Sequence, residues 1–149
     1  VAEAVEAVEA AQDNVEVAVD IRPKSNMSPE EMVFFVKNGK REGVITTPTG
    51  MQYELVVGSG RGTSPTLRDR IDFFYFAEYQ KDGETVKLQK DGYINIKYQD
   101  EEWQEIYQLL KIGNTYRFYL PTEYSKNAPA ILANEGEMII VDIELMRIR

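Results

Sequence analysis

The sequence contains no cysteine and no histidine among its 149 residues. These two absences exclude thiol nucleophiles, Ser-His-Asp triads and zinc sites built from cysteine or histidine. No D-x-D-x-D-G calcium loop is present either, so we predict neither a metal site nor a cofactor. Without cysteine there is no disulfide framework, and cysteine usage says nothing about the redox compartment. Any chemistry must therefore proceed without thiols or imidazoles.

Basic residues are also scarce, because 17 Lys and Arg stand against 25 Asp and Glu, giving a net charge of −8. This sign disfavours binding to the polyanionic backbone of nucleic acids. No apolar run approaches the roughly 18 residues that a membrane-spanning helix needs. The composition, with 43% hydrophobic and 28% charged residues, is otherwise ordinary for a globular protein. We expect neither a nucleic-acid partner nor a membrane span.

The negative charge is concentrated in an acidic arm, Val1–Asp20, which carries six acidic side chains and no basic one. Its first twelve residues are alanine, valine and glutamate with a single terminal glutamine. Two interpretations are open: a solvated, partly helical linker, or a segment that docks onto a partner or a second copy. The chain starts at Val1 rather than Met, so we expect that a leader or other upstream sequence was removed, although a cloning boundary would give the same start.

Two segments have the pattern of amphipathic helices. The tetrapeptide Ser28-Pro29-Glu30-Glu31 combines a capping serine, a proline suited to the first turn and a glutamate that completes an S-x-x-E capping box. It predicts a helix over residues 29–39. A second helix is predicted over Asp100–Leu110, because one face carries Trp103, Ile106, Tyr107 and Leu110.

After Gly43 the apolar period changes from that of a helix to that of a strand. Five predicted strands are rich in Val, Ile, Tyr and Phe: Met51–Val57, Arg70–Tyr79, Tyr93–Tyr98, Tyr116–Leu120 and Met138–Ile148. Turn signals separate them at Thr47–Gly50, Gly58–Gly60, Lys81–Gly83 and Lys90–Gly92. The pattern predicts an α+β fold, an antiparallel sheet wrapped on one short helix, with an N-terminal helix and the acidic arm.

Residues 43–149 also contain five short motifs in a fixed order. They are Gly43-Val44-x-Thr46-Thr47-Pro48-x-Gly50-Met51-Gln52-Tyr53, Asp82-Gly83, Trp103-x-Glu105-x-x-x-x-Leu110-x-x-Gly113, Leu120-Pro121-x-Glu123-Tyr124 and the strand Ile139–Leu145. In this order they resemble the motifs of FKBP-type prolyl isomerases, particularly the bacterial Mip and FkpA branch. The resemblance implies three parts: an arm and linker (1–27), a helix and connector (28–42) and an FKBP-like domain (43–149).

The resemblance implies rotation about X-Pro bonds as the activity and the periplasm or cell envelope as the location. Rotation about a peptide bond has a barrier of about 18–20 kcal/mol, and an apolar cleft lowers it by desolvating the twisted amide. No nucleophile or proton shuttle is needed, which suits a chain without cysteine or histidine. A protein or peptide is then the expected partner, with a larger envelope assembly reached through the acidic arm as a further expectation.

The same resemblance places eight residues in the family's peptide-binding pocket: Trp103, Phe76, Val86, Lys87, Gln99, Asp100, Lys126 and Val141. Only Trp103 keeps the family's residue type. Phenylalanine replaces a tyrosine at 76, Val-Lys replaces Phe-Asp at 86–87, polar residues replace Val-Ile at 99–100, lysine replaces tyrosine at 126, and valine replaces phenylalanine at 141. No residue is assigned as catalytic.

Each of these positions also has a purely structural interpretation. Trp103, Phe76, Val86 and Val141 would all serve as packing residues. The segment from Gln99 to Glu102 fits an acidic helix N-terminus, and both lysines would be solvated.

Two functions therefore compete. One is an active prolyl isomerase that assists protein folding, and the other is a binding, scaffold or chaperone-like module with weak or no isomerase activity. The replaced pocket residues favour the second, because a fold alone does not fix the function.

The acidic arm yields a first prediction. A free Ala/Val/Glu helix of this length is marginal in water, and the arm has few large apolar side chains to bury. Deleting Val1–Asp20 should leave the melting temperature almost unchanged in a thermal unfolding scan while abolishing assembly with a partner or a second copy. A drop of more than roughly 5 °C, about 1 kcal/mol for a domain of this size, would mean that the arm packs on the core.

Overall fold

The computed structural model describes residues 28–81, 83–122, 124 and 138–149. Within these residues the chain forms α1 (Pro29–Gly39), β1 (Ile45–Thr46), β2 (Gln52–Val57), β3 (Arg70–Lys81), β4 (Glu84–Asn95), a 3₁₀-helix (Ile96–Tyr98), α2 (Glu101–Leu109), β5 (Thr115–Leu120) and β6 (Ile139–Ile148). The strand order in the six-stranded sheet is β1-β2-β5-β6-β3-β4. The predicted α+β fold is confirmed. Among the described residues, no helix is long and apolar enough to cross a membrane.

The chain divides into two compact units, residues 1–52 and 53–149. In the described part of the first unit, α1 begins as predicted, with the Ser28 hydroxyl accepting the Glu31 N–H at 3.1 Å. The other end of α1 is held by the buried Gln52 side chain. Its amide oxygen accepts from the Asn38 amide at 2.9 Å, and its amide nitrogen donates to the Phe35 carbonyl at 2.8 Å.

The predicted division at residues 27 and 42 stays a prediction, and residues 1–27, with the acidic arm, lie outside the described part of the chain.

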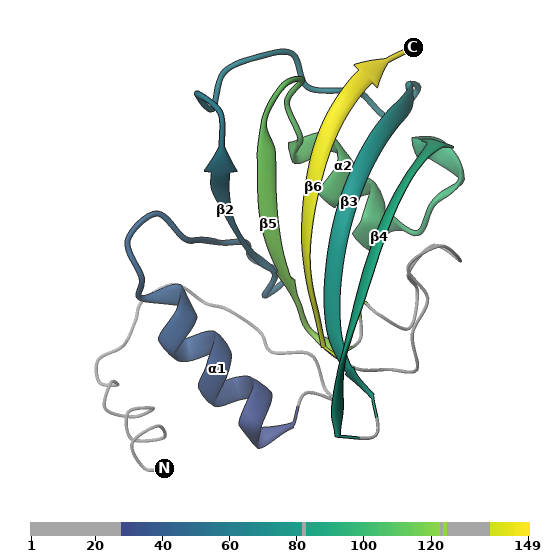
Figure 1. Ribbon diagram of the computed structural model, residues 1–149. Helices are drawn as coiled ribbons and strands as arrows, with labels where there is room; N and C mark the ends of the chain where they lie inside the picture. Colours follow the sequence, from purple (N-terminus) through teal and green to yellow (C-terminus); the bar gives the residue numbers. More distant parts are fainter. Residues whose placement is uncertain (1–27, 82, 123, 125–137) are drawn as a thin grey trace. The chain divides into compact units, whose positions relative to one another are not determined.

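The second unit is built around β3, which pairs antiparallel with β4 on one side and with β6 on the other, while β5 pairs with β6 (Figure 1). Alternation along β3 gives the sheet two different faces. The odd-numbered residues Ile71, Phe73, Tyr75 and Ala77 are buried, and we call their side the inner face. The even-numbered residues from Asp72 to Glu78 lie on the outer face. Helix α2 lies across the inner face, where the Tyr107 ring is 5.9 Å from that of Phe73.

Two sequence predictions about β4 are wrong. Lys90–Gly92 was predicted to be a turn, but these residues continue the strand and pair with Tyr75, Phe74 and Phe73. The strand predicted at Tyr93–Tyr98 instead begins at Glu84, and it ends at Asn95 because Ile96–Tyr98 forms a 3₁₀-helix. The unbroken ladder with β3 overrides the turn preference of Lys-Asp-Gly, since twelve register pairs hold one strand against the other.

A buried asparagine joins two loops at one end of the second unit. The Asn114 side chain, 2% exposed, accepts the Gly60 N–H at 2.8 Å and donates to the Arg61 carbonyl at 2.7 Å and the Ile112 carbonyl at 3.1 Å. Gly58 has a φ of 111°, and a Cβ added there would lie 2.2 Å from the Asn114 amide oxygen. The loop therefore needs glycine at position 58 for both its conformation and its closeness to Asn114.

Replacing this glycine tests the asparagine contact. Gly58→Ala should lower the free energy of unfolding by about 2 kcal/mol more than Gly113→Ala, as measured by urea denaturation. Gly113 is a matched control, because its φ is also positive, at 83°, and an added Cβ would meet nothing within 4 Å. Equal losses in the two variants would mean that Asn114 can move aside at no cost.

Candidate functional site

Three of the residues expected to form the site, Gln99, Asp100 and Trp103, lie on α2 or directly before it. Asp100 is the N-cap residue of this helix, and Glu101 and Glu102 lie in its first turn, where carboxylates are stabilised by the helix dipole. The helix buries Trp103, Ile106 and Tyr107, each at most 1% exposed, toward the inner face. The rings of Trp103 and Tyr107 are 6.0 Å apart, so Trp103 is part of an aromatic core.

The single tryptophan has its polar atom satisfied within the chain. The Trp103 indole N–H donates to the Tyr124 carbonyl at 3.0 Å, and both residues are fully buried. Because an indole has only one donor, this bond leaves none for a ligand. In this arrangement Trp103 joins α2 to the segment after β5 and presents no exposed ring surface.

Tyr75 is an inner-face residue that sequence reasoning missed. Its ring stacks on Phe73 at 5.5 Å, and its buried hydroxyl has no hydrogen-bond partner among the described residues. Burial raises the pKa of Tyr75 above its ordinary value, because the phenolate would lose its hydration. The sequence contained a signal for the position of Tyr75. Alternate residues of a strand face opposite sides, which places Ile71, Phe73 and Tyr75 on one face and Phe76 on the other.

The eight predicted pocket residues do not share one face. Trp103 and Val141 are fully buried on the inner side, and Val86, which pairs with Tyr79, is half-buried on that side. Phe76 and Lys87 are exposed on the outer face, while Gln99 and Asp100 precede α2. Lys126 lies outside the described residues. Of the seven that the structure describes, three therefore lie on the inner side, and the assignment of all eight to one pocket stays a prediction.

Comparison with known proteins gives a consistent set of similarities. Residues 1–55 match a family described as the domain amino terminal to FKBP-type peptidyl-prolyl isomerase. The chain is 27% identical to the FKBP-type isomerase FkpA of Aeromonas hydrophila over 77% of its own length and 44% of the relative's. It is 25% identical to the isomerase Mip of Coxiella burnetii over 78% and 52% of the two lengths. The chain thus spans about half the length of such curated relatives.

Solved structures agree on the fold. A peptidyl-prolyl isomerase from Pseudomonas syringae superimposes with a TM-score of 0.64 at 18% identity, covering 85% of this chain and 96% of that one. FkpA from Escherichia coli superimposes with a TM-score of 0.62, also at 18% identity, covering 99% and 81%. At this identity the similarity establishes the architecture alone.

The unpartnered hydroxyl of Tyr75 yields a stability prediction. Tyr75→Phe should leave the free energy of unfolding unchanged or raise it by about 1 kcal/mol, because it removes a buried polar group that has no partner. Tyr119→Phe is the contrasting variant, since the Tyr119 hydroxyl donates to Glu54 at 2.5 Å, and it should be destabilising. Both values come from urea denaturation. A loss in Tyr75→Phe as large as that in Tyr119→Phe would contradict the account of this hydroxyl.

Proposed function

We propose, from the premise that this chain is a Mip/FkpA-like relative of the FKBP-type peptidyl-prolyl isomerases, that it acts chiefly by binding protein segments. In this proposal it is a scaffold or chaperone-like module of the bacterial envelope, with weak or no isomerase activity. The envelope location rests on the family resemblance. Because the chain spans about half of its curated relatives, their activity does not transfer automatically.

The observation that carries the proposal is the complete burial of Trp103. Isomerisation without a nucleophile needs an apolar cleft that admits the proline ring and desolvates the preceding carbonyl. Here the indole is 0% exposed and its N–H donates to the Tyr124 carbonyl. A substrate could reach the ring only by displacing core side chains, and close packing makes that costly.

The replaced pocket residues support the same proposal. Gln99 and Asp100 stand where the resembling family has an apolar Val-Ile pair, and Asp100 is the N-cap residue before an acidic first turn. Lys87 stands where the family has an aspartate, and it pairs in register with Glu78 on the outer face. A peptide carbonyl that approaches the start of α2 would meet these carboxylates, which repel its partial negative charge.

An active isomerase is the second candidate function, and Tyr75 is the observation that favours it. A buried hydroxyl without a partner is a donor that could stabilise a substrate carbonyl on the inner face. The Tyr75 ring belongs to the same aromatic cluster as Trp103, because the Phe73 and Tyr107 rings lie between them.

A protease-coupled assay on a short X-Pro peptide separates the two functions. We expect a kcat/KM below about 10⁴ M⁻¹s⁻¹, at the bottom of the range of efficient enzymes. We expect Tyr75→Phe to leave kcat/KM unchanged, because in this proposal the Tyr75 hydroxyl does not contact a substrate.

Two results would establish the isomerase instead. One is a wild-type kcat/KM near 10⁷ M⁻¹s⁻¹, which is typical of efficient enzymes. The other is a tenfold or larger loss of activity in Tyr75→Phe with the circular dichroism spectrum unchanged, since that loss requires contact between the hydroxyl and the reacting peptide.

A further inference from the structure

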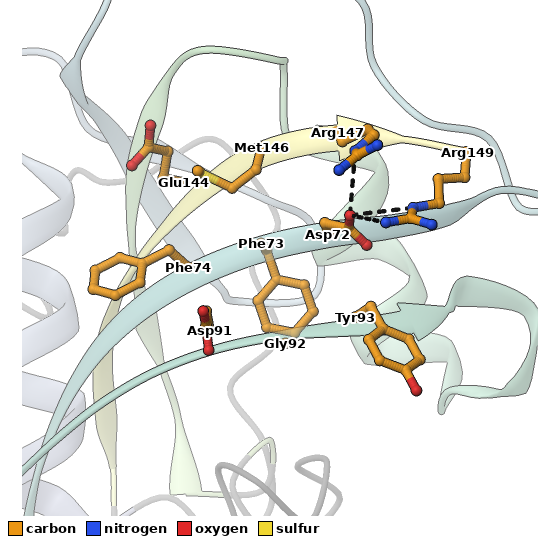
Figure 2. Close-up of a pocket in the computed structure, with 10 residues that line it drawn as sticks. All are labelled: Asp72, Phe73, Phe74, Asp91, Gly92, Tyr93, Glu144, Met146, Arg147 and Arg149. Atoms are coloured by element: carbon orange, nitrogen blue, oxygen red, sulfur yellow. Dashed lines mark hydrogen bonds and ion pairs between the residues drawn. The ribbon is translucent and has the colours of Figure 1, made fainter.

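The outer face of the sheet carries a groove that is separate from the inner face and from Trp103. It runs over β6, β3 and β4, with a volume of about 650 Å³ (Figure 2). Four apolar residues line it: Phe73 is almost fully buried, Phe74 is half-buried, and Met146 and Tyr93 are 55% and 64% exposed. Large apolar side chains clustered on a sheet face are a common sign of a binding surface.

Phe74 is the centre of a row of three side chains that crosses the three strands. It pairs in register with Asp91 of β4 on one side and with Glu144 of β6 on the other. Directly opposite residues on one face have Cβ atoms about 5 Å apart, so both carboxylates border the ring. Figure 2 shows Glu144, Phe74 and Asp91 at the same end of the groove.

Two other acids of the outer face, Asp142 and Asp72, are paired with arginine side chains. Asp142 accepts two hydrogen bonds from the Arg117 guanidinium, at 2.7 and 3.0 Å. Asp72, at the opposite end of the groove, pairs with Arg147 at 3.4 Å and Arg149 at 2.8 Å. Among the described residues, the side chains of Asp91 and Glu144 make neither a hydrogen bond nor an ion pair. The end of the groove around Phe74 is therefore acidic, whereas the end around Asp72 carries an excess of guanidinium charge.

We propose that this groove binds an extended segment of a partner protein, which places an Arg or Lys side chain over Phe74 between Asp91 and Glu144. The partner's next apolar side chain lies against Met146 or Tyr93. This proposal goes beyond the proposed function, because it concerns the outer face and holds whether or not the inner face supports isomerisation.

The physical basis is charge complementarity around an aromatic ring. A cation above the ring is attracted to its π face, and the attraction grows as the site is desolvated. Neighbouring strands are about 4.8 Å apart, so a cation above the β3 ring lies within reach of carboxylates on both flanking strands.

Fluorescence anisotropy on the full chain tests the proposal, with a labelled, capped hexapeptide of alternating leucine and arginine as probe. The same peptide with glutamate in place of arginine is the control ligand. We expect the arginine peptide to bind at least tenfold more tightly than the glutamate peptide, and more weakly as salt is raised. The double variant Asp91→Asn/Glu144→Gln should lose about tenfold in affinity for the arginine peptide.

A matched double variant separates the groove from the overall charge. Glu42→Gln/Glu84→Gln makes the same change in charge at two exposed carboxylates outside the groove, and it should bind the arginine peptide like the wild type. Phe74→Leu keeps an apolar side chain but removes the ring, and it should weaken binding several-fold. Circular dichroism checks the fold of each variant. If the double variant unfolds, Glu144→Gln alone replaces it, with an expected loss of about threefold in affinity for the arginine peptide.

Three results would overturn the proposal. One is equal affinity for the arginine and glutamate peptides, and another is equal loss in the groove variant and the matched control, which would indicate nonspecific attraction. The third is self-association in sedimentation experiments that Asp91→Asn/Glu144→Gln abolishes while the arginine peptide fails to bind. That result would make a second copy of the chain the occupant of the groove.

Discussion

Helix α2 packs Trp103, Ile106 and Tyr107 toward the inner face of the sheet, and this contact sets the geometry of the second unit. Each of the three is at most 1% exposed, and truncating a buried aromatic side chain typically costs about 3–5 kcal/mol. The contact determines which parity of β3 is buried, and through the antiparallel register it also determines the buried parity of β6. The hydrogen bond from the Trp103 indole N–H to the Tyr124 carbonyl joins the segment after β5 to the same core.

The alternation that this packing imposes divides the chemistry between the two faces. On the inner face a polar group is costly unless it has a partner, and the Tyr75 hydroxyl is the one side chain there that breaks this rule among the described residues. On the outer face unpaired carboxylates are tolerated because water solvates them, so Asp91 and Glu144 can stay without a cation until a partner supplies one. The outer face of the sheet can therefore carry a binding surface that is independent of the packing on the inner face.

The sequence predicted the architecture well where local signals and packing agree. The capping box at Ser28 and the apolar stripe of Trp103 gave α1 and α2 nearly to the residue. The turn predicted at Lys90–Gly92 was wrong, because this sequence lies inside β4 and its pairing with β3 determines its conformation. The family resemblance assigned Phe76 to the pocket, and that assignment stays a prediction; the pleat of β3 places Phe76 on the outer face and Tyr75 on the inner face. The row formed by Asp91, Phe74 and Glu144 could not be predicted, because it exists only in the register of three strands.

The central claim is that Trp103 belongs to a filled core and does not line an open cleft. Because Trp103 is the only tryptophan, its fluorescence reports on this site alone. The measurement is quenching of that emission by acrylamide, with and without a saturating X-Pro peptide. The account predicts blue-shifted emission, weak quenching and no change on adding the peptide. Strong quenching that the peptide relieves would contradict it, because the indole would then be accessible and covered by substrate.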